Sequence, residues 1–289
     1  MGQPSDNLKD VYDDIFKIND YFYETEQGTL INNATPNDLI HKYCDYGSSS
    51  EKGNCQNDYL KMASSGVIHL LTNLKKYKLE DDKLAEYAIL WLSYKLNEKP
   101  KNKLTDLNKF YTSYIEKNKC YNEKINGDGS TYKDIINRKK DLMSINEISK
   151  FNDPFGMLLS LYYLVHLNKL DCEKCSQNAN EFVQNFEDLN KDSNDKENSS
   201  YNKLLSTLSN DYDNLKKIFK NKCPNLQPLP ELNPKKSSGK DSVDISGKGD
   251  KQLLGDTFEV TSSSSSTLNT VIPVLSTFAI PVFLGVAYK

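Results

Sequence analysis

The chain contains the segment Asp82-Lys-Leu-Ala-Glu-Tyr-Ala-Ile-Leu-Trp-Leu-Ser-Tyr-Lys-Leu96. Between residues 83 and 96, apolar side chains fall on nearly every face of a helix, and Trp91 lies among them. A helix that is apolar all round has to be covered by other elements, because none of its faces suits contact with water. The segment therefore predicts a helix at the centre of a bundle, with Trp91 buried.

Other segments repeat apolar residues at the 3.6-residue period of an amphipathic helix. One stripe consists of Leu104, Leu107, Tyr111 and Tyr114, and a longer one of Tyr201, Leu204, Leu208, Tyr212, Leu215 and Phe219. Long alternating patterns, which would predict β-strands, are absent from the sequence. We therefore expect residues 1–223 to form an all-α domain, a multi-helix bundle of about eight helices.

The composition changes after residue 223. Residues 224–266 contain Pro224, Pro228, Pro230 and Pro234, followed by lysines, glycines and the serine run at 262–266. Such a segment has too little apolar surface to offset the conformational entropy that ordering would remove. We expect it to be a disordered Pro/Ser/Lys-rich stalk.

The end of the chain predicts a single C-terminal transmembrane helix over residues 267–288. Residues 271–288 contain no charged side chain, and ten of these 18 residues are Val, Ile, Leu or Phe. These ten contribute about −3 to −6 kcal/mol to insertion at the bilayer centre. A buried C-terminal helix is the alternative, but such helices are usually shorter and carry a polar side. The expected anchor residues are Val271, Leu275, Phe278, Ile280, Phe283 and Leu284.

The charged residues are unusual in kind but balanced in number. The net charge is −3, which excludes the strongly basic character of a nucleic-acid-binding protein. Of the 37 basic residues 36 are lysines, and Arg138 is the one arginine. Asn occurs 31 times and Ala 7 times. Because Lys and Asn have A/T-rich codons and Ala has G/C-rich ones, we interpret this bias as the mark of an A/T-rich genome.

Six cysteines offer two kinds of site. Cys44 and Cys55 flank a Gly/Ser-rich loop, so they are a candidate disulfide if the compartment is oxidising and free thiols if it is reducing. Cys172 and Cys175 have the spacing of a redox or zinc motif, but the βαβ context and two further ligands are missing. We expect no cofactor and no metal.

The sequence holds no P-loop, nucleophile-elbow or metalloprotease motif, so we expect no catalytic residues and no enzyme. The amino terminus lacks a basic region followed by an apolar run, so it does not predict an ordinary secretory signal. A C-terminal span without such a signal ordinarily indicates a tail-anchored protein with its main domain in the cytosol.

Several segments resemble the Plasmodium interspersed repeat (PIR) proteins of rodent malaria parasites. The central helical segment looks like the signature of this family, and the other matches run in order toward the C-terminus. They are Phe110-Tyr-Thr-Ser-Tyr-Ile-Glu-Lys-Asn118, Lys139-Lys-Asp-Leu-Met143, Ala179-Asn-Glu-Phe-Val183, Leu205-Ser-Thr-Leu-Ser-Asn-Asp-Tyr212, Glu259-Val-Thr-Ser-Ser-Ser-Ser-Ser266 and Phe283-Leu-Gly-Val-Ala-Tyr-Lys289.

The resemblance implies a largely helical variant antigen with one C-terminal span, exported toward the infected red cell or the parasitophorous vacuole and associated with immune evasion. Its partners would be the membrane lipid bilayer and host protein ligands whose identity is not settled, and no nucleic acid. The chain departs from the family pattern at both ends. Tyr12 lies where members commonly carry a cysteine, and the chain stops at Lys289 where members continue into a short basic tail.

Two functional hypotheses follow. The preferred one is an exported, membrane-anchored variant antigen that is not an enzyme and acts in host interaction. The alternative is a tail-anchored cytosolic adaptor or scaffold protein. A GPI anchor is a third topology, since serines, a polar spacer and an apolar tail imitate its signal, but it requires an N-terminal signal.

The predicted membrane span can be tested by introducing charged residues into it. Replacing both Leu275 and Phe283 by Lys adds about 5–7 kcal/mol to the insertion free energy, close to or beyond the whole apolar gain. We expect the double variant to be extracted by alkaline carbonate while the wild type stays in the membrane pellet. Release of the wild type by carbonate would contradict the predicted span.

Overall fold

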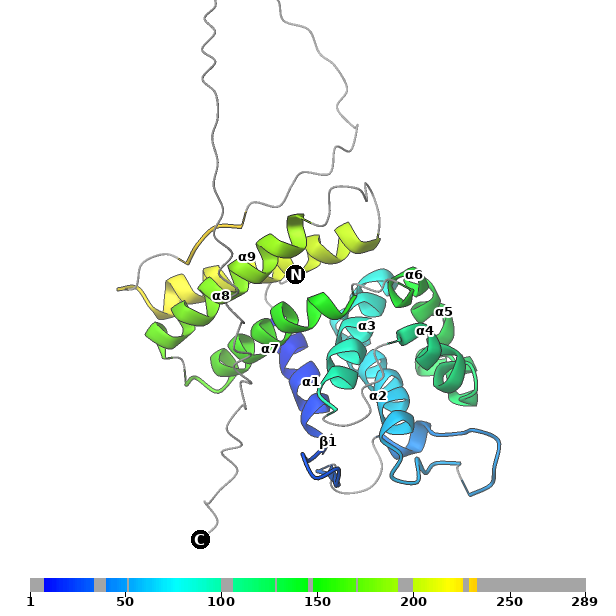
Figure 1. The fold of residues 1–289 in the computed structure, drawn as a ribbon. Helices are drawn as coiled ribbons and strands as arrows, with labels where there is room; N and C mark the ends of the chain where they lie inside the picture. The colour runs from blue at the N-terminus through cyan, green and yellow to red at the C-terminus, as the bar shows by residue number, and fades with distance from the viewer. Residues whose placement is uncertain are drawn as a thin grey trace, which may run out of the picture. The chain divides into compact units, whose positions relative to one another are not determined.

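The structure is a computed structural model that describes residues 8–33, 40–50, 52–99, 106–127, 129–144, 148–169, 171–191, 200–225 and 229–232. Within these ranges helices dominate (Figure 1). The α-helices are α1 (Leu8–Asp20), α2 (Tyr59–Leu74), α3 (Asp81–Asn97), α4 (Leu107–Phe110), α5 (Tyr132–Asn137), α6 (Lys140–Met143), α7 (Asn152–His166), α8 (Cys172–Lys191) and α9 (Ser200–Lys222). The expected helix-dominated domain is confirmed.

Short helical turns connect these helices. They are the 3-10 turns η2 (His41–Tyr43), η3 (Lys75–Tyr77), η5 (Lys119–Asn122), η6 (Ile125–Gly127) and η7 (Ile148–Phe151), and the π-helical turn η4 (Tyr111–Ile115). Because α4 runs directly into η4, the apolar residues Leu107, Tyr111 and Ile115 are all buried on one side of this segment. Of the predicted stripe, Leu107 and Tyr111 are buried and Tyr114 is half-buried, while Leu104 lies outside the described residues.

Helix α3 occupies the centre of the bundle, as its sequence predicts. It packs against α2, α5 and α7, and every side chain from Leu84 to Ser93 is buried. Trp91 is completely buried, which confirms its predicted place in the core. Two glycines let neighbouring helices come close to α3. A Cβ atom at Gly66 on α2 would lie 2.5 Å from the Trp91 ring, and one at Gly156 on α7 would lie 2.6 Å from the Tyr94 ring.

Aromatic rings fill the interface between α1 and α7. Tyr12 stacks on Tyr162 with ring centroids 4.3 Å apart, and Phe16 stacks on Tyr163 at 3.5 Å. The N-terminal helix is thereby held against a helix whose sequence lies some 150 residues later, as the two lie side by side in Figure 1. Such long-range pairing has no signature in a local sequence pattern.

A small β-hairpin follows α1. Strands β1 (Phe22–Glu24) and β2 (Leu30–Asn32) are antiparallel, with Phe22 opposite Asn32 and Glu24 opposite Leu30. Each strand has only three residues, which is too short for an alternating pattern to be recognised. The sequence therefore did not predict this hairpin. Phe22 points into the core, and Gly28 supplies the positive φ of the turn.

The predicted stripe of α9 is buried along its whole length, from Tyr201 to Phe219. The packed domain does not end with this helix. Leu229 and Leu232 are buried, the Tyr212 hydroxyl donates to the Pro230 carbonyl at 3.2 Å, and Lys216 pairs with Glu231. Residues 229–232 therefore return along α9, and the domain extends beyond the boundary that we predicted at residue 223. We call residues 229–232 the return segment.

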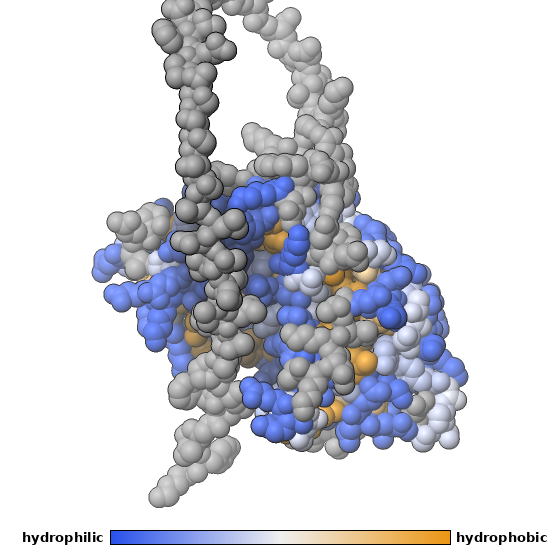
Figure 2. All heavy atoms as spheres, viewed as in Figure 1, coloured by the Kyte–Doolittle hydropathy of each residue, from blue (hydrophilic) through white to orange (hydrophobic). Residues whose placement is uncertain are grey.

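The described surface is mainly hydrophilic in the view of Figure 2. Among the described residues the one exposed large apolar side chain is Leu167, at 38%. None of the helices in the described ranges combines the length and the apolar character that a bilayer crossing requires. The predicted span at 267–288, its six anchor residues and the stalk from residue 233 onward lie outside the described residues.

The return segment should stabilise the domain. Replacing Leu229 and Leu232 by Ala in a chain ending at residue 240 should lower the free energy of unfolding by about 2–4 kcal/mol, because two buried leucine side chains lose their contacts. Urea unfolding followed by the fluorescence of Trp91 measures this. The matched control is Leu167→Ala, which removes an exposed leucine. Equal stability of the double variant and the control would show that the return segment does not contribute.

Candidate functional site

The loop between Cys44 and Cys55 is a covalently closed protrusion beside α2 (Figure 1). The structure joins the two cysteines by a disulfide with Cα atoms 5.3 Å apart, and both cysteines are buried. Most of the described residues between them are exposed, including Ser48 and Asn54. The loop therefore presents a polar tip on a base that is fixed at both ends.

Asn118 holds the base of this loop to the bundle. Its side chain is buried, and its amide nitrogen donates to the Tyr43 carbonyl at 2.7 Å. Its amide oxygen accepts from the main-chain nitrogens of Asp45 and Cys120, both at 3.2 Å. The position needs a donor and an acceptor on one side chain, which asparagine supplies and aspartate does not. Nothing in the local sequence marks Asn118 among the many other asparagines.

A second disulfide joins Cys172, at the start of α8, to Cys223, just after α9. The Cα atoms lie 6.0 Å apart across a sequence separation of 51 residues. The close pair Cys172 and Cys175 thus does not act as one motif, because Cys172 has its partner on another helix. Sequence spacing could not reveal that pairing, since it depends on α8 and α9 lying against each other.

The two remaining cysteines, Cys120 and Cys175, are buried free thiols. Burial raises the pKa of each thiol to about 11, with smaller contributions from nearby carboxylates such as Glu123 and Asp171. A thiol with so high a pKa carries almost no thiolate at neutral pH, and the thiolate is the reactive form. Neither cysteine is placed to act as a nucleophile.

The three histidines lie apart, and each has its own neighbour. The His41 ring accepts from the Cys55 main-chain nitrogen at 3.1 Å, His69 contacts Asn73 at 3.0 Å, and His166 contacts Asp13 at 3.3 Å. Burial lowers the pKa of His69 to about 4, so this ring is neutral at physiological pH. Within the described ranges no group of three or more His, Cys, Asp or Glu side chains could hold a metal ion.

The buried polar groups connect helices. Asp211 on α9 is buried and accepts from the hydroxyls of Tyr12 at 2.8 Å and Tyr87 at 2.9 Å, while its main-chain carbonyl accepts from Tyr162 at 2.7 Å. Burial raises the pKa of the Asp211 carboxyl, and Lys83, 4.0 Å away, opposes that rise. The tyrosines come from α1, α3 and α7, so the carboxylate and the main-chain carbonyl of this one residue on α9 together join four helices.

Two further buried groups have structural partners. Glu86 accepts from Thr207 at 2.6 Å and pairs with Lys139 at 2.9 Å, which connects α3 to α9 and to the start of α6. The Lys95 ammonium donates to the Asn19 carbonyl at 2.6 Å and lies over the Phe22 ring. Burial lowers the pKa of Lys95, and Glu98 opposes that shift. These charges hold the bundle together.

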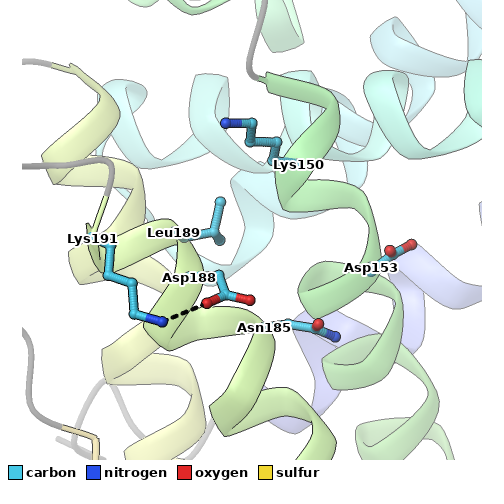
Figure 3. Close-up of a pocket in the computed structure, with 6 residues that line it drawn as sticks. All are labelled: Lys150, Asp153, Asn185, Asp188, Leu189 and Lys191. Carbon is cyan, nitrogen blue, oxygen red and sulfur yellow. Dashed lines mark hydrogen bonds and ion pairs between the residues drawn. The ribbon is translucent and has the colours of Figure 1, made fainter. Parts of the chain in front are cut away.

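A surface cleft of about 450 Å³ lies between η7, the start of α7 and the second half of α8. Figure 3 shows the side chains that line it. Its lining includes Lys150 and Asp153 on one side and Asn185 and Asp188 on the other. Lys191 donates to Asp188 at 2.8 Å at the edge of the cleft. The cleft brings together two lysines and two aspartates, with no serine, cysteine or histidine among the lining residues. Its lining residues therefore offer no hydroxyl, thiol or imidazole group.

The described part of the chain is dominated by helices, and its fold has a solved counterpart. A solved structure described as a Plasmodium PIR protein ectodomain is 34% identical to this chain, with a TM-score of 0.56, and the match covers 79% of this chain and 98% of that one. The family model of the Plasmodium variant antigen protein Cir/Yir/Bir matches residues 12–289. The chain belongs to this family of Plasmodium variant antigens, as its resemblance to the PIR proteins predicts. None of the curated proteins shows a significant match.

The two disulfides should stabilise the domain to different extents. Loop-closure entropy gives about 3 kcal/mol for a loop of 11 residues and about 4 kcal/mol for one of 51. We expect Cys172→Ala/Cys223→Ala to lower the free energy of unfolding more than Cys44→Ala/Cys55→Ala does, as measured by urea unfolding without reductant.

Cys175→Ala is the matched control, because it removes a buried thiol without removing a cross-link. Its expected cost is about 1 kcal/mol. If both double variants lose no more stability than this control, the cross-links do not constrain the unfolded chain as the entropy model requires.

Proposed function

We propose that this protein is an exported, membrane-anchored variant antigen whose helical domain faces a host or vacuolar compartment. In that compartment it takes part in host interaction and immune evasion, and it acts by binding rather than by catalysis. The observation that carries the proposal is the family match. It extends from Tyr12, in the first helix, through the apolar segment at 271–288. The helical domain and the expected anchor therefore both lie within the residues that the family model matches.

The disulfides support an oxidising compartment. Thiols of cytosolic proteins are kept reduced, whereas disulfides persist in secreted and surface proteins. Cys44 and Cys55 close a loop at the surface, and Cys172 and Cys223 close one end of the α8–α9 pair. This pattern favours an exported antigen over the alternative of a tail-anchored cytosolic adaptor, whose cysteines would be expected as free thiols.

The structure separates residues that maintain the fold from residues that face solvent. The loop between Cys44 and Cys55 keeps its base through the disulfide and through Asn118, so the identities of Ser48, Ser49 and Ser50 at its exposed tip matter little to stability. A surface that can change while the core stays intact suits an antigen that varies from member to member.

The expected stalk sets how far the domain can reach from the membrane. Residues 233–266 separate the return segment from the predicted span, and a flexible chain of 34 residues has an end-to-end distance of roughly 30 Å. A domain tethered at that distance can move over the membrane surface and still contact molecules on an opposing cell. We therefore infer a display function for the stalk.

Redox state in the parasite tests the compartment. Alkylation of unfolded protein from infected red cells, followed by mass spectrometry, should show Cys120 and Cys175 as thiols and the other four cysteines as disulfides, because only the latter have partners in the structure. A cytosolic parasite protein from the same lysate is the control and should be fully reduced. Six free thiols would favour the cytosolic adaptor.

Microscopy of the tagged protein tests anchoring and export together. The full chain should localise to a membrane beyond the parasite plasma membrane, and a chain ending at residue 266 should lose that membrane association, since it lacks the apolar segment. Retention of the full chain in the parasite cytosol would contradict the proposal.

A further inference from the structure

A second pocket, of about 330 Å³, lies between α1, α7 and the residue that follows β2. Its apolar lining consists of the rings of Phe16, Tyr21 and Tyr163 and the side chain of Leu167. Leu167 is the large apolar side chain that the described surface exposes most. The pocket therefore offers aromatic and aliphatic contact to a ligand at a site where the rest of the described surface is polar.

The polar groups of this pocket are mostly hydrogen-bond acceptors. Asp20 contributes a carboxylate that makes no direct ion pair with another described side chain, and Lys95 acts on it only through its charge at longer range. Asn33 donates its amide nitrogen to the Asp20 carbonyl at 3.2 Å, which leaves its amide oxygen as an acceptor. Burial raises the pKa of Asp20, and the charge of Lys95 opposes that rise, while the side chain itself stays accessible to solvent.

The lysine in the pocket does not supply that cation. The Lys17 ammonium binds the Asp13 carboxylate at 2.6 Å, and His166 contacts the other oxygen of Asp13 at 3.3 Å. Lys17 and Asp13 neutralise each other, so the pocket keeps the negative charge of Asp20. The Nδ1 atom of His166 is buried and has no hydrogen-bond partner among the described residues.

The rings of this pocket also differ from the rings that lysines cover elsewhere in the described ranges. Eight other aromatic rings in the described ranges lie under a lysine ammonium, with distances of 3.9–5.7 Å to the ring centroid. No such contact is made to Phe16, Tyr21 or Tyr163 within the described ranges. Aromatic rings beside an unpaired carboxylate form the surroundings that bind a cation on an apolar stem.

We propose that this pocket binds an arginine side chain of a partner protein. The guanidinium group is planar, so it can lie against the rings and direct its N–H donors to the carboxylate of Asp20 and the amide oxygen of Asn33. The methylene stem packs against Leu167. A quaternary ammonium group fits less well, because its charged nitrogen carries no N–H to donate to either acceptor. The pocket belongs to the folded domain, so this proposal does not depend on export or anchoring.

Saturation-transfer NMR on the full chain in mild detergent tests the proposal, with Nα-acetyl-L-arginine methylamide as the probe. We expect saturable binding with a dissociation constant on the order of millimolar, as is usual for one side chain on its own. Nα-acetyl-norleucine methylamide, which has the stem without the charge, and phosphocholine are the comparison ligands and should bind more weakly.

Two variants locate the binding. Asp20→Asn should weaken arginine binding about fivefold or more, because it removes the charge that faces the guanidinium. Asp10→Asn is the matched control, since Asp10 is an exposed aspartate on the same helix outside the pocket. Leu167→Arg places a guanidinium at the pocket from the protein itself and should compete with the probe. Because Leu167 is exposed, this variant does not depend on repacking the core.

The proposal is overturned if Asp20→Asn binds the probe as tightly as Asp10→Asn, or if Leu167→Arg leaves binding unchanged. Equal binding of the norleucine ligand would show an apolar pocket without charge selection. Equal or tighter binding of phosphocholine would assign the pocket to a lipid headgroup in place of a protein side chain.

Discussion

The carboxylate of Asp211 lies buried on α9, with the hydroxyls of Tyr12 and Tyr87 donating to it and Lys83 4.0 Å away. A buried carboxylate without such partners is strongly destabilising, because it is withdrawn from water with nothing to replace the lost hydrogen bonds. The partners come from α1 and α3, and Tyr162 on α7 donates to the adjacent carbonyl. Helix α9 therefore has one position along the bundle in which Asp211 is fully paired, and the depth and register of four helices follow from it.

Tyr12 occupies a position where the resemblance to PIR proteins leads one to expect a cysteine, since members commonly carry one in the first dozen residues. The structure shows the tyrosine buried, stacked on Tyr162 and hydrogen-bonded to Asp211. The attachment of α1 to the rest of the domain is thus made by packing and hydrogen bonds, while the two disulfides lie elsewhere, at the loop after η2 and at the end of the α8–α9 pair.

The core and the surface of the domain obey different constraints. In the core, Gly66 and Gly156 are required because Trp91 and Tyr94 occupy the space that a Cβ atom would need. On the surface, lysines pair with carboxylates or lie over aromatic rings, and a lysine can be replaced there at little cost. The pocket that contains Asp20 departs from this pattern, since among the described residues its carboxylate makes no direct ion pair and its rings lie under no lysine ammonium. A binding partner is most easily inferred at a surface site whose carboxylate and rings lack the lysine contacts that such groups make elsewhere.

The sequence by itself determined the helical class, the central position of residues 83–96, the burial of Trp91 and of the stripe from Tyr201 to Phe219, and the family. These features depend on periodicity within single segments and on motifs that can each be recognised without knowing how the segments pack. Only the tertiary structure decided the pairing of Cys172 with Cys223, the role of Asn118, the convergence of Tyr12 and Tyr87 on Asp211, and the packing of residues 229–232 beyond the predicted boundary. Each of these joins residues far apart in the chain or on different elements. Whether two such residues meet depends on how the helices pack, and a period read along one segment carries no information about that.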